Sequence, residues 1–142
     1  MIKQYNKTQL DQIMAIWLQA NIKAHDFIPS SYWQDNFLQV KNLLPEAELL
    51  VFEEDDVVKG FIGLVGDYVA GIFVRQCFQR QGIGKSLLEE VKQRYSLLEL
   101  NVYEKNTFAV AFYNKQGFVT VKKKIDPATS EKEYLMRWES CR

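Results

Sequence analysis

The chain has 142 residues, its 18 Lys and Arg are balanced by 18 Asp and Glu, and 47% of its residues are hydrophobic. This length is typical of a single soluble domain, so we expect one domain over residues 1–142. With no net charge, neither nucleic acid nor an anionic membrane is an expected partner, and no apolar run reaches the roughly 20 residues of a membrane span. The N-terminus lacks an apolar leader, which favours a cytoplasmic location.

The residues that most often hold structural metals are scarce. Two cysteines, Cys77 and Cys141, stand far apart, and His25 is the single histidine. Three such residues cannot complete a closed structural zinc site, so we predict no metal. The cysteines are interpreted as unpaired thiols.

The first third of the chain is predicted to form two helices. Thr8 is placed to cap the first, because apolar residues then recur every three or four positions over residues 10–17. A loop containing Pro29 leads to a second helix with one apolar side, which Pro45 ends.

The rest of the chain alternates between strands and helices. Strands are expected at residues 49–52, 57–65, 68–74, 97–103, 118–121 and 133–138, and helices at 84–95 and 106–116. Polar turns join the first three strands and favour antiparallel pairing. A helix separates the third strand from the fourth, so these two should run parallel. The order predicts a mixed α/β sheet with helices on both faces.

A glycine-rich turn follows the third strand, in the segment Gln-Arg-Gln-Gly-Ile-Gly at residues 79–84. A strand that enters such a turn and then a helix presents free backbone amides to an anion, and the helix dipole adds positive potential. Gly82 and Gly84 allow the close approach of a ligand, while Arg80 and Lys85 supply local charge. A tight turn without any ligand is the alternative interpretation of this segment alone.

Two other nucleotide motifs fit this turn less well. The P-loop pattern ends in Gly84-Lys85-Ser86 but requires a glycine at position 79, which is Gln. The dinucleotide-binding pattern requires a third glycine at position 87, which is Leu. The pattern Gln/Arg-x-x-Gly-x-Gly/Ala is complete, and it resembles the pyrophosphate-binding motif of GNAT N-acetyltransferases.

A second motif, Asn-x-x-Ala-x-x-Phe-Tyr-x-x-x-Gly-Phe, spans residues 106–118 and resembles the other half of the GNAT signature. Asn106, Ala109 and Tyr113 fall on one face of a helix, where the small Ala109 allows a ligand to pass. Asn106 could instead act only as a helix cap, and Tyr113 could be a core tyrosine. The resemblance implies a GNAT-like fold, a largely antiparallel sheet of seven strands with one central parallel pair.

The resemblance also implies an acetyl-CoA-dependent N-acetyltransferase that moves an acetyl group directly to a primary amine of a small molecule or a protein. The backbone of Ile72, Phe73 and Val74 would bind the pantetheine arm, with the amide of Phe73 or Val74 polarising the thioester. Tyr113 would protonate the departing thiolate as general acid. The implied cofactor-binding residues are Ile72, Phe73, Val74, Gln79, Arg80, Gln81, Gly82, Ile83, Gly84, Lys85, Asn106 and Tyr113.

The general base and the acceptor are less defined. A lysine-like amine of pKa ~10.4 is almost fully protonated at neutral pH, so a base is useful. His25 and Glu104 are the favoured candidates, with Asp67 and Glu99 behind them, and aromatic residues near His25 could line an acceptor pocket. A catalytically idle acyl-CoA sensor or partner-binding module is the alternative function. The oligomeric state, monomer or homodimer, stays open.

Overall fold

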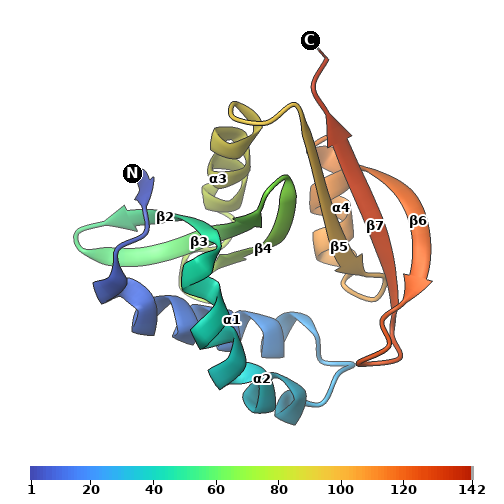
Figure 1. The fold of residues 1–142 in the computed structure, drawn as a ribbon, viewed down its shortest axis with the longest axis horizontal. Helices are drawn as coiled ribbons and strands as arrows, with labels where there is room; N and C mark the ends of the chain where they lie inside the picture. Colours follow the sequence, from blue (N-terminus) through green and yellow to red (C-terminus); the bar gives the residue numbers. More distant parts are fainter. Residues whose placement is uncertain (142) are drawn as a thin grey trace.

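The computed structural model describes residues 1–141, which form one mixed sheet with two helices on each face (Figure 1). The strands lie in the order β1-β2-β3-β4-β5-β7-β6, and every neighbouring pair is antiparallel except β4 and β5. The strands are β1 (Ile2–Gln4), β2 (Glu48–Glu54), β3 (Val57–Val65), β4 (Tyr68–Val74), β5 (Leu97–Tyr103), β6 (Val119–Ile125) and β7 (Lys132–Glu139). The helices are α1 (Leu10–Ala24), α2 (Ser30–Leu43), α3 (Ile83–Lys92) and α4 (Thr107–Lys115). The predicted mixed sheet with one parallel pair is confirmed.

Each face of the sheet carries its own hydrophobic core. Residues of α1 and α2 bury one face, around Ile13, Trp17 and Phe61. Residues of α3 and α4 bury the other, around Leu87 and Phe118. Because successive side chains of a strand point to opposite faces of the sheet, the same strands supply both cores. Alternate residues of a strand therefore pack against different pairs of helices.

Three local features differ from the sequence-based expectation. Asn6, not Thr8, caps the first helical segment, through a capping box with Gln9 that begins a short 3-10 turn (Lys7–Gln9) before α1. Strand β1 was not predicted, because three residues with only Ile2 partly buried are too short to show alternation. Strand β6 is longer than predicted, since its lysine-rich second half is an exposed edge strand without an apolar pattern.

The sheet opens at its parallel pair. Tyr68 and Glu99 form the single bridge between β4 and β5, next to a backbone hydrogen bond from the Glu99 amide to the Asp67 carbonyl at 3.0 Å. A short distance further along, Ala70 has no partner on β3, because Val69 pairs with Leu64 and Gly71 with Gly63. Such an extra residue bends a strand and increases its twist. This bulge accounts for the divergence of β4 from β5 in Figure 1.

No helix within residues 1–141 combines the length and the apolar character that crossing a membrane requires.

Candidate active site

A cleft of about 480 Å³ lies where β4 and β5 diverge. Its walls come from the C-terminal end of α1, the open edges of β4 and β5, the turn that begins α3, and one side of α4. All of the predicted cofactor-binding residues except the exposed Gln81 line it. The two sequence motifs therefore meet in one site, although 22 positions separate Gly84 from Asn106.

Backbone groups of β4 face the cleft at alternate residues. The Arg75 amide donates to the Lys59 carbonyl at 2.8 Å, which makes 75/59 and 73/61 the hydrogen-bonded pairs of the β3–β4 ladder. The amide of Phe73 therefore points at β3, while those of Ile72 and Val74 point to the open edge. Of the two amides predicted to polarise a thioester, only that of Val74 faces the cleft, and Ile72 adds another.

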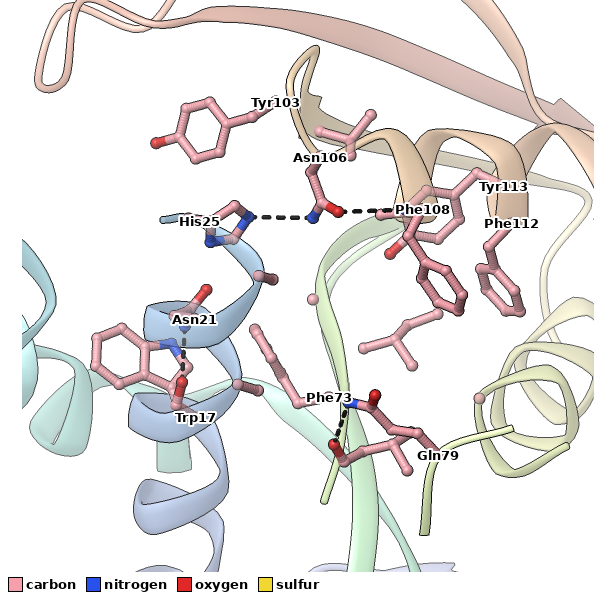
Figure 2. A pocket seen from close by; sticks show the side chains of 18 of the residues that line it. Trp17, Asn21, His25, Phe73, Gln79, Tyr103, Asn106, Phe108, Phe112 and Tyr113 are labelled. Carbon is pink, nitrogen blue, oxygen red and sulfur yellow. Dashed lines mark hydrogen bonds between the residues drawn. The ribbon is translucent and has the colours of Figure 1, made fainter. Parts of the chain in front are cut away.

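The glycine-rich turn forms the cleft's other end. Arg80 and Gly82 adopt left-handed backbone conformations, with φ of 66° and 83°, and this curvature turns the chain into α3. No side chain caps the first turn of α3, so the amides of Ile83 and Gly84 are free to bind an anion. The Gln79 side chain steadies the turn by donating to the Val74 carbonyl at 3.1 Å (Figure 2).

Asn106 and Tyr113 lie on the side of α4 that faces the cleft (Figure 2). Asn106 caps α4, since its side-chain oxygen accepts from the Ala109 amide at 3.3 Å, and its side-chain nitrogen lies 3.2 Å from Nε2 of His25. Tyr113 is 8% exposed, and burial raises the pKa of its phenol, so that the hydroxyl stays protonated at neutral pH. Asn106 thus fulfils the cap interpretation and still lines the cleft.

Aromatic rings surround His25 at the opposite wall. The imidazole stacks on Trp33, with ring centroids 5.1 Å apart, and meets the edge of Tyr103 at 5.2 Å. Burial lowers the pKa of His25, which keeps the ring neutral at physiological pH. Trp33 and Tyr103 line the cleft, whereas Phe27 and Tyr32 pack around these rings without lining it.

The carboxylates predicted as bases occupy different places. Glu104 does not line the cleft and accepts a hydrogen bond from the Tyr134 hydroxyl at 3.0 Å. Glu99 forms an ion pair with Arg137 at 2.7 Å, and Asp67 does not line the cleft. The acid that does line it is Glu133 on β7, which the sequence reasoning missed.

Glu133 can be assigned to the cleft only when the register of β7 against β5 is known. The register places it opposite Tyr103, on the face that also carries Asn101. Alternation within residues 97–103 could have identified Asn101 and Tyr103 as polar residues on one face, but nothing local to residues 132–139 indicates the register.

Neither cysteine takes part in the site, because Cys77 and Cys141 are both free and exposed. Within residues 1–141, no group of three or more His, Cys, Asp or Glu side chains is arranged to hold a metal ion.

The fold and the cleft together define a class of protein. It is an α/β protein whose sheet opens between two parallel strands, with an anion cradle at one end of the opening and a buried tyrosine beside it. An extended ligand with phosphates at one end suits such a cleft, because strand-edge amides can bind its length while the helix N-terminus binds its charge.

Comparison with known proteins identifies the family. Residues 16–129 match the model of the acetyltransferase (GNAT) domain. The chain is 36% identical to the peptidyl-lysine N-acetyltransferase YiaC of Escherichia coli over 97% of this chain and 96% of that protein. It is 37% identical to the peptidyl-lysine N-acetyltransferase YjaB of Salmonella typhimurium over 82% of this chain and 81% of that protein.

A solved structure agrees with these relatives. The solution structure of the apo form of YjaB from Escherichia coli superimposes with a TM-score of 0.87 at 27% identity, covering 99% of this chain and 98% of that one. The chain belongs to the GNAT acetyltransferase family. It is an N-acetyltransferase.

Proposed function

We propose that this N-acetyltransferase acetylates the ε-amine of lysine residues in peptides or proteins. The observation that carries the proposal is the group of rings around His25, where Trp33 and Tyr103 both line the cleft that also contains Tyr113. An unbranched alkyl chain ending in an amine suits such a wall, because its methylene groups can pack on the rings while the amine reaches the interior. The two peptidyl-lysine N-acetyltransferases to which the chain is similar support the same acceptor.

The acetyl donor would bind along the open edge of β4. The turn at residues 79–85 suits the pyrophosphate, since its free amides, Arg80 and Lys85 all favour negative charge. The pantetheine arm would then extend along β4 past the amides of Val74 and Ile72, with Asn106 on the opposite side. Because the acetyl end lies farthest from the phosphates, the Ile72 amide is the better-placed donor to the thioester carbonyl.

Tyr113 would act on the leaving group. When the amine attacks the thioester carbon and the C–S bond breaks, CoA leaves as a thiolate that needs a proton. Tyr113 lines the cleft, and burial keeps its hydroxyl protonated. It is therefore available to give its proton to the sulfur.

His25 is the better supported of the two predicted bases. It lines the cleft, whereas Glu104 does not, and its lowered pKa keeps the imidazole in the form that accepts a proton. Its hydrogen-bonding contact with Asn106 links it to the helix that carries Tyr113. The ammonium would lose one proton to His25 and so become the attacking amine. The same nitrogen would lose a second proton as the tetrahedral intermediate collapses, and this proton replaces the one that Tyr113 gives to the thiolate.

Three matched peptides test the acceptor. One has an internal lysine and a blocked N-terminus, the second has a free N-terminus and no lysine, and the third has acetyl-lysine in place of lysine. We expect release of free thiol with the first peptide only, and mass spectrometry should place the acetyl group on the lysine side chain. Preference for the second peptide would contradict the proposal, and tight acetyl-CoA binding without turnover on any amine would favour a sensor.

A further inference from the structure

The polar atoms that the fold leaves without partners gather in one place. Within residues 1–141, three buried side-chain atoms lack a hydrogen-bond partner, namely Nδ1 of His25, Nε1 of Trp33 and Oδ1 of Asn101, and all three residues line the cleft. A buried polar group without a partner is costly, so native structures rarely keep one without a reason. Because three such atoms belong to residues that line one cleft, we infer that a ligand supplies the missing partners.

Asn101 has one side-chain atom engaged and one open. Its nitrogen donates to the Tyr68 hydroxyl at 2.8 Å, which fixes the side chain and leaves the buried oxygen of this cleft-lining residue without a donor. Tyr68 lines the same cleft as Tyr113. The Asn101 side chain is therefore anchored within the cleft that also holds the group assigned to the departing thiolate, where the acceptor amine must arrive.

Glu133 supplies negative charge beside this oxygen. The register pairs Asn101 with Leu135 and Tyr103 with Glu133, which makes Asn101 and Glu133 diagonal neighbours on one face of the sheet. Such neighbours have Cβ atoms about 7 Å apart, a span that one ammonium group can bridge by hydrogen bonds to both side chains. Burial raises the pKa of the Tyr68 phenol, and the charge of Glu133 adds to this rise.

Glu133 has only a long ion pair as counter-charge although it is largely buried. Glu99 has a close partner in Arg137 at 2.7 Å, and Asp126 accepts from the Tyr103 hydroxyl at 2.6 Å. The ion pair of Glu133 with Lys124 is long, at 3.7 Å, although the Glu133 side chain is only 14% exposed. A carboxylate that is mostly withdrawn from water and only weakly paired attracts a cation.

We propose that Asn101 Oδ1 and the Glu133 carboxylate form the subsite that binds the protonated amine of the acceptor. The site rests on the proposed function for its acceptor class, a primary amine on an unbranched alkyl chain, and it deepens that proposal by naming what selects the amine. A neutral hydroxyl leaves the carboxylate without its counter-charge, so an alcohol of the same shape should bind less well. Binding of the cation and loss of its proton are separate steps, and His25 remains assigned to the second.

Binding of small fragments tests the subsite without requiring turnover. Chemical shifts of the Asn101 side-chain amide are followed by NMR during titration of the acetyl-CoA-free enzyme with butylamine and, separately, with 1-butanol. The wild type should bind butylamine about 10- to 100-fold more tightly than butanol, as expected for hydrogen bonds to a charged group. Glu133→Gln should lose most of this preference. Equal preference in the wild type and Glu133→Gln would overturn the proposal.

Turnover provides the second measurement. With a lysine peptide, Glu133→Gln and Asn101→Leu should each raise KM for the peptide about 10-fold or more while KM for acetyl-CoA is unchanged. Glu139→Gln is the matched control, since Glu139 lies on the same strand and face about 20 Å away, and it should behave as the wild type. An unchanged peptide KM in Asn101→Leu would remove Asn101 from the subsite.

The outcomes separate this inference from the proposed function. If the wild type does not acetylate lysine peptides, the proposed acceptor is wrong, yet the preference for butylamine over butanol still tests the subsite. Loss of folding is not expected in Glu133→Gln. Burial and the nearby Asp126 raise the pKa of Glu133, so its negative charge is a cost to the native state, and a neutral amide removes that cost.

Discussion

The two ends of the cleft present different chemical groups. The end proposed to bind the acetyl donor presents backbone groups, because amides of β4 and of the first turn of α3 face the cleft. The end proposed to bind the acceptor presents side chains, among them His25, Tyr68, Asn101 and Glu133. Backbone recognition tolerates many side chains but requires glycine at fixed positions, whereas side-chain recognition requires particular residues whose sequence positions are unconstrained.

The largest effect should come from the group between the two ends. Tyr113→Phe removes the proton donor to the thiolate, and we expect kcat to fall about 100-fold or more, while the dissociation constant of acetyl-CoA stays the same. Steady-state kinetics and isothermal titration calorimetry give the two quantities. Tyr95→Phe is the control, since the Tyr95 hydroxyl bonds to Glu48 and does not line the cleft. Normal turnover in Tyr113→Phe would exclude the assigned acid.

A pair of glycine substitutions isolates the role of the backbone at the donor end. Gly82 and Gly66 both have left-handed φ, 83° and 62°, and an added Cβ would meet nothing within 4 Å at either. Gly82→Ala and Gly66→Ala should therefore each destabilise the fold by about 1 kcal/mol, measured by urea unfolding. Only Gly82→Ala should also weaken acetyl-CoA binding, because Gly66 lies in the β3–β4 turn. Equal cofactor affinity in both variants would contradict the anion cradle.

The smallest effect concerns the acceptor end and depends on pH. Burial lowers the pKa of His25 below the 6.5 of the unfolded chain. As pH falls through 6.5 toward the native pKa, the unfolded state binds a proton that the native state does not, so stability is lost on acidification and is constant above about pH 7.5. His25→Phe keeps an aromatic ring but removes this titration. Its Tm should fall less than that of the wild type between pH 7.5 and 5.0, and parallel profiles would show that His25 is not buried as described.

The contrast between backbone groups at one end of the cleft and side chains at the other also explains which parts of the molecule are predictable from sequence. Glycines at 82 and 84 and the Asn106–Tyr113 spacing are local patterns, so the sequence alone indicates the donor end and the family fold. Glu133 could not be found this way, because its place depends on the register of β7 against β5, which long-range pairing sets. The splay of β4 was equally hidden, since the Ala70 bulge follows from how β3 pairs and leaves no glycine or proline at that position.

The bulge at Ala70 also affects how the protein avoids unwanted association. Beyond the Tyr68–Glu99 bridge, β4 and β5 both have unpaired backbone edges in the middle of the sheet, the kind of surface on which other chains can add strands. These edges face one another across a cleft of about 480 Å³ whose walls include residues of α1 and α4. A foreign strand must fit between these helices to reach either edge, so we expect a thin ligand arm to enter more readily. The geometry that opens the site to its cosubstrate therefore protects the interior edges from aggregation.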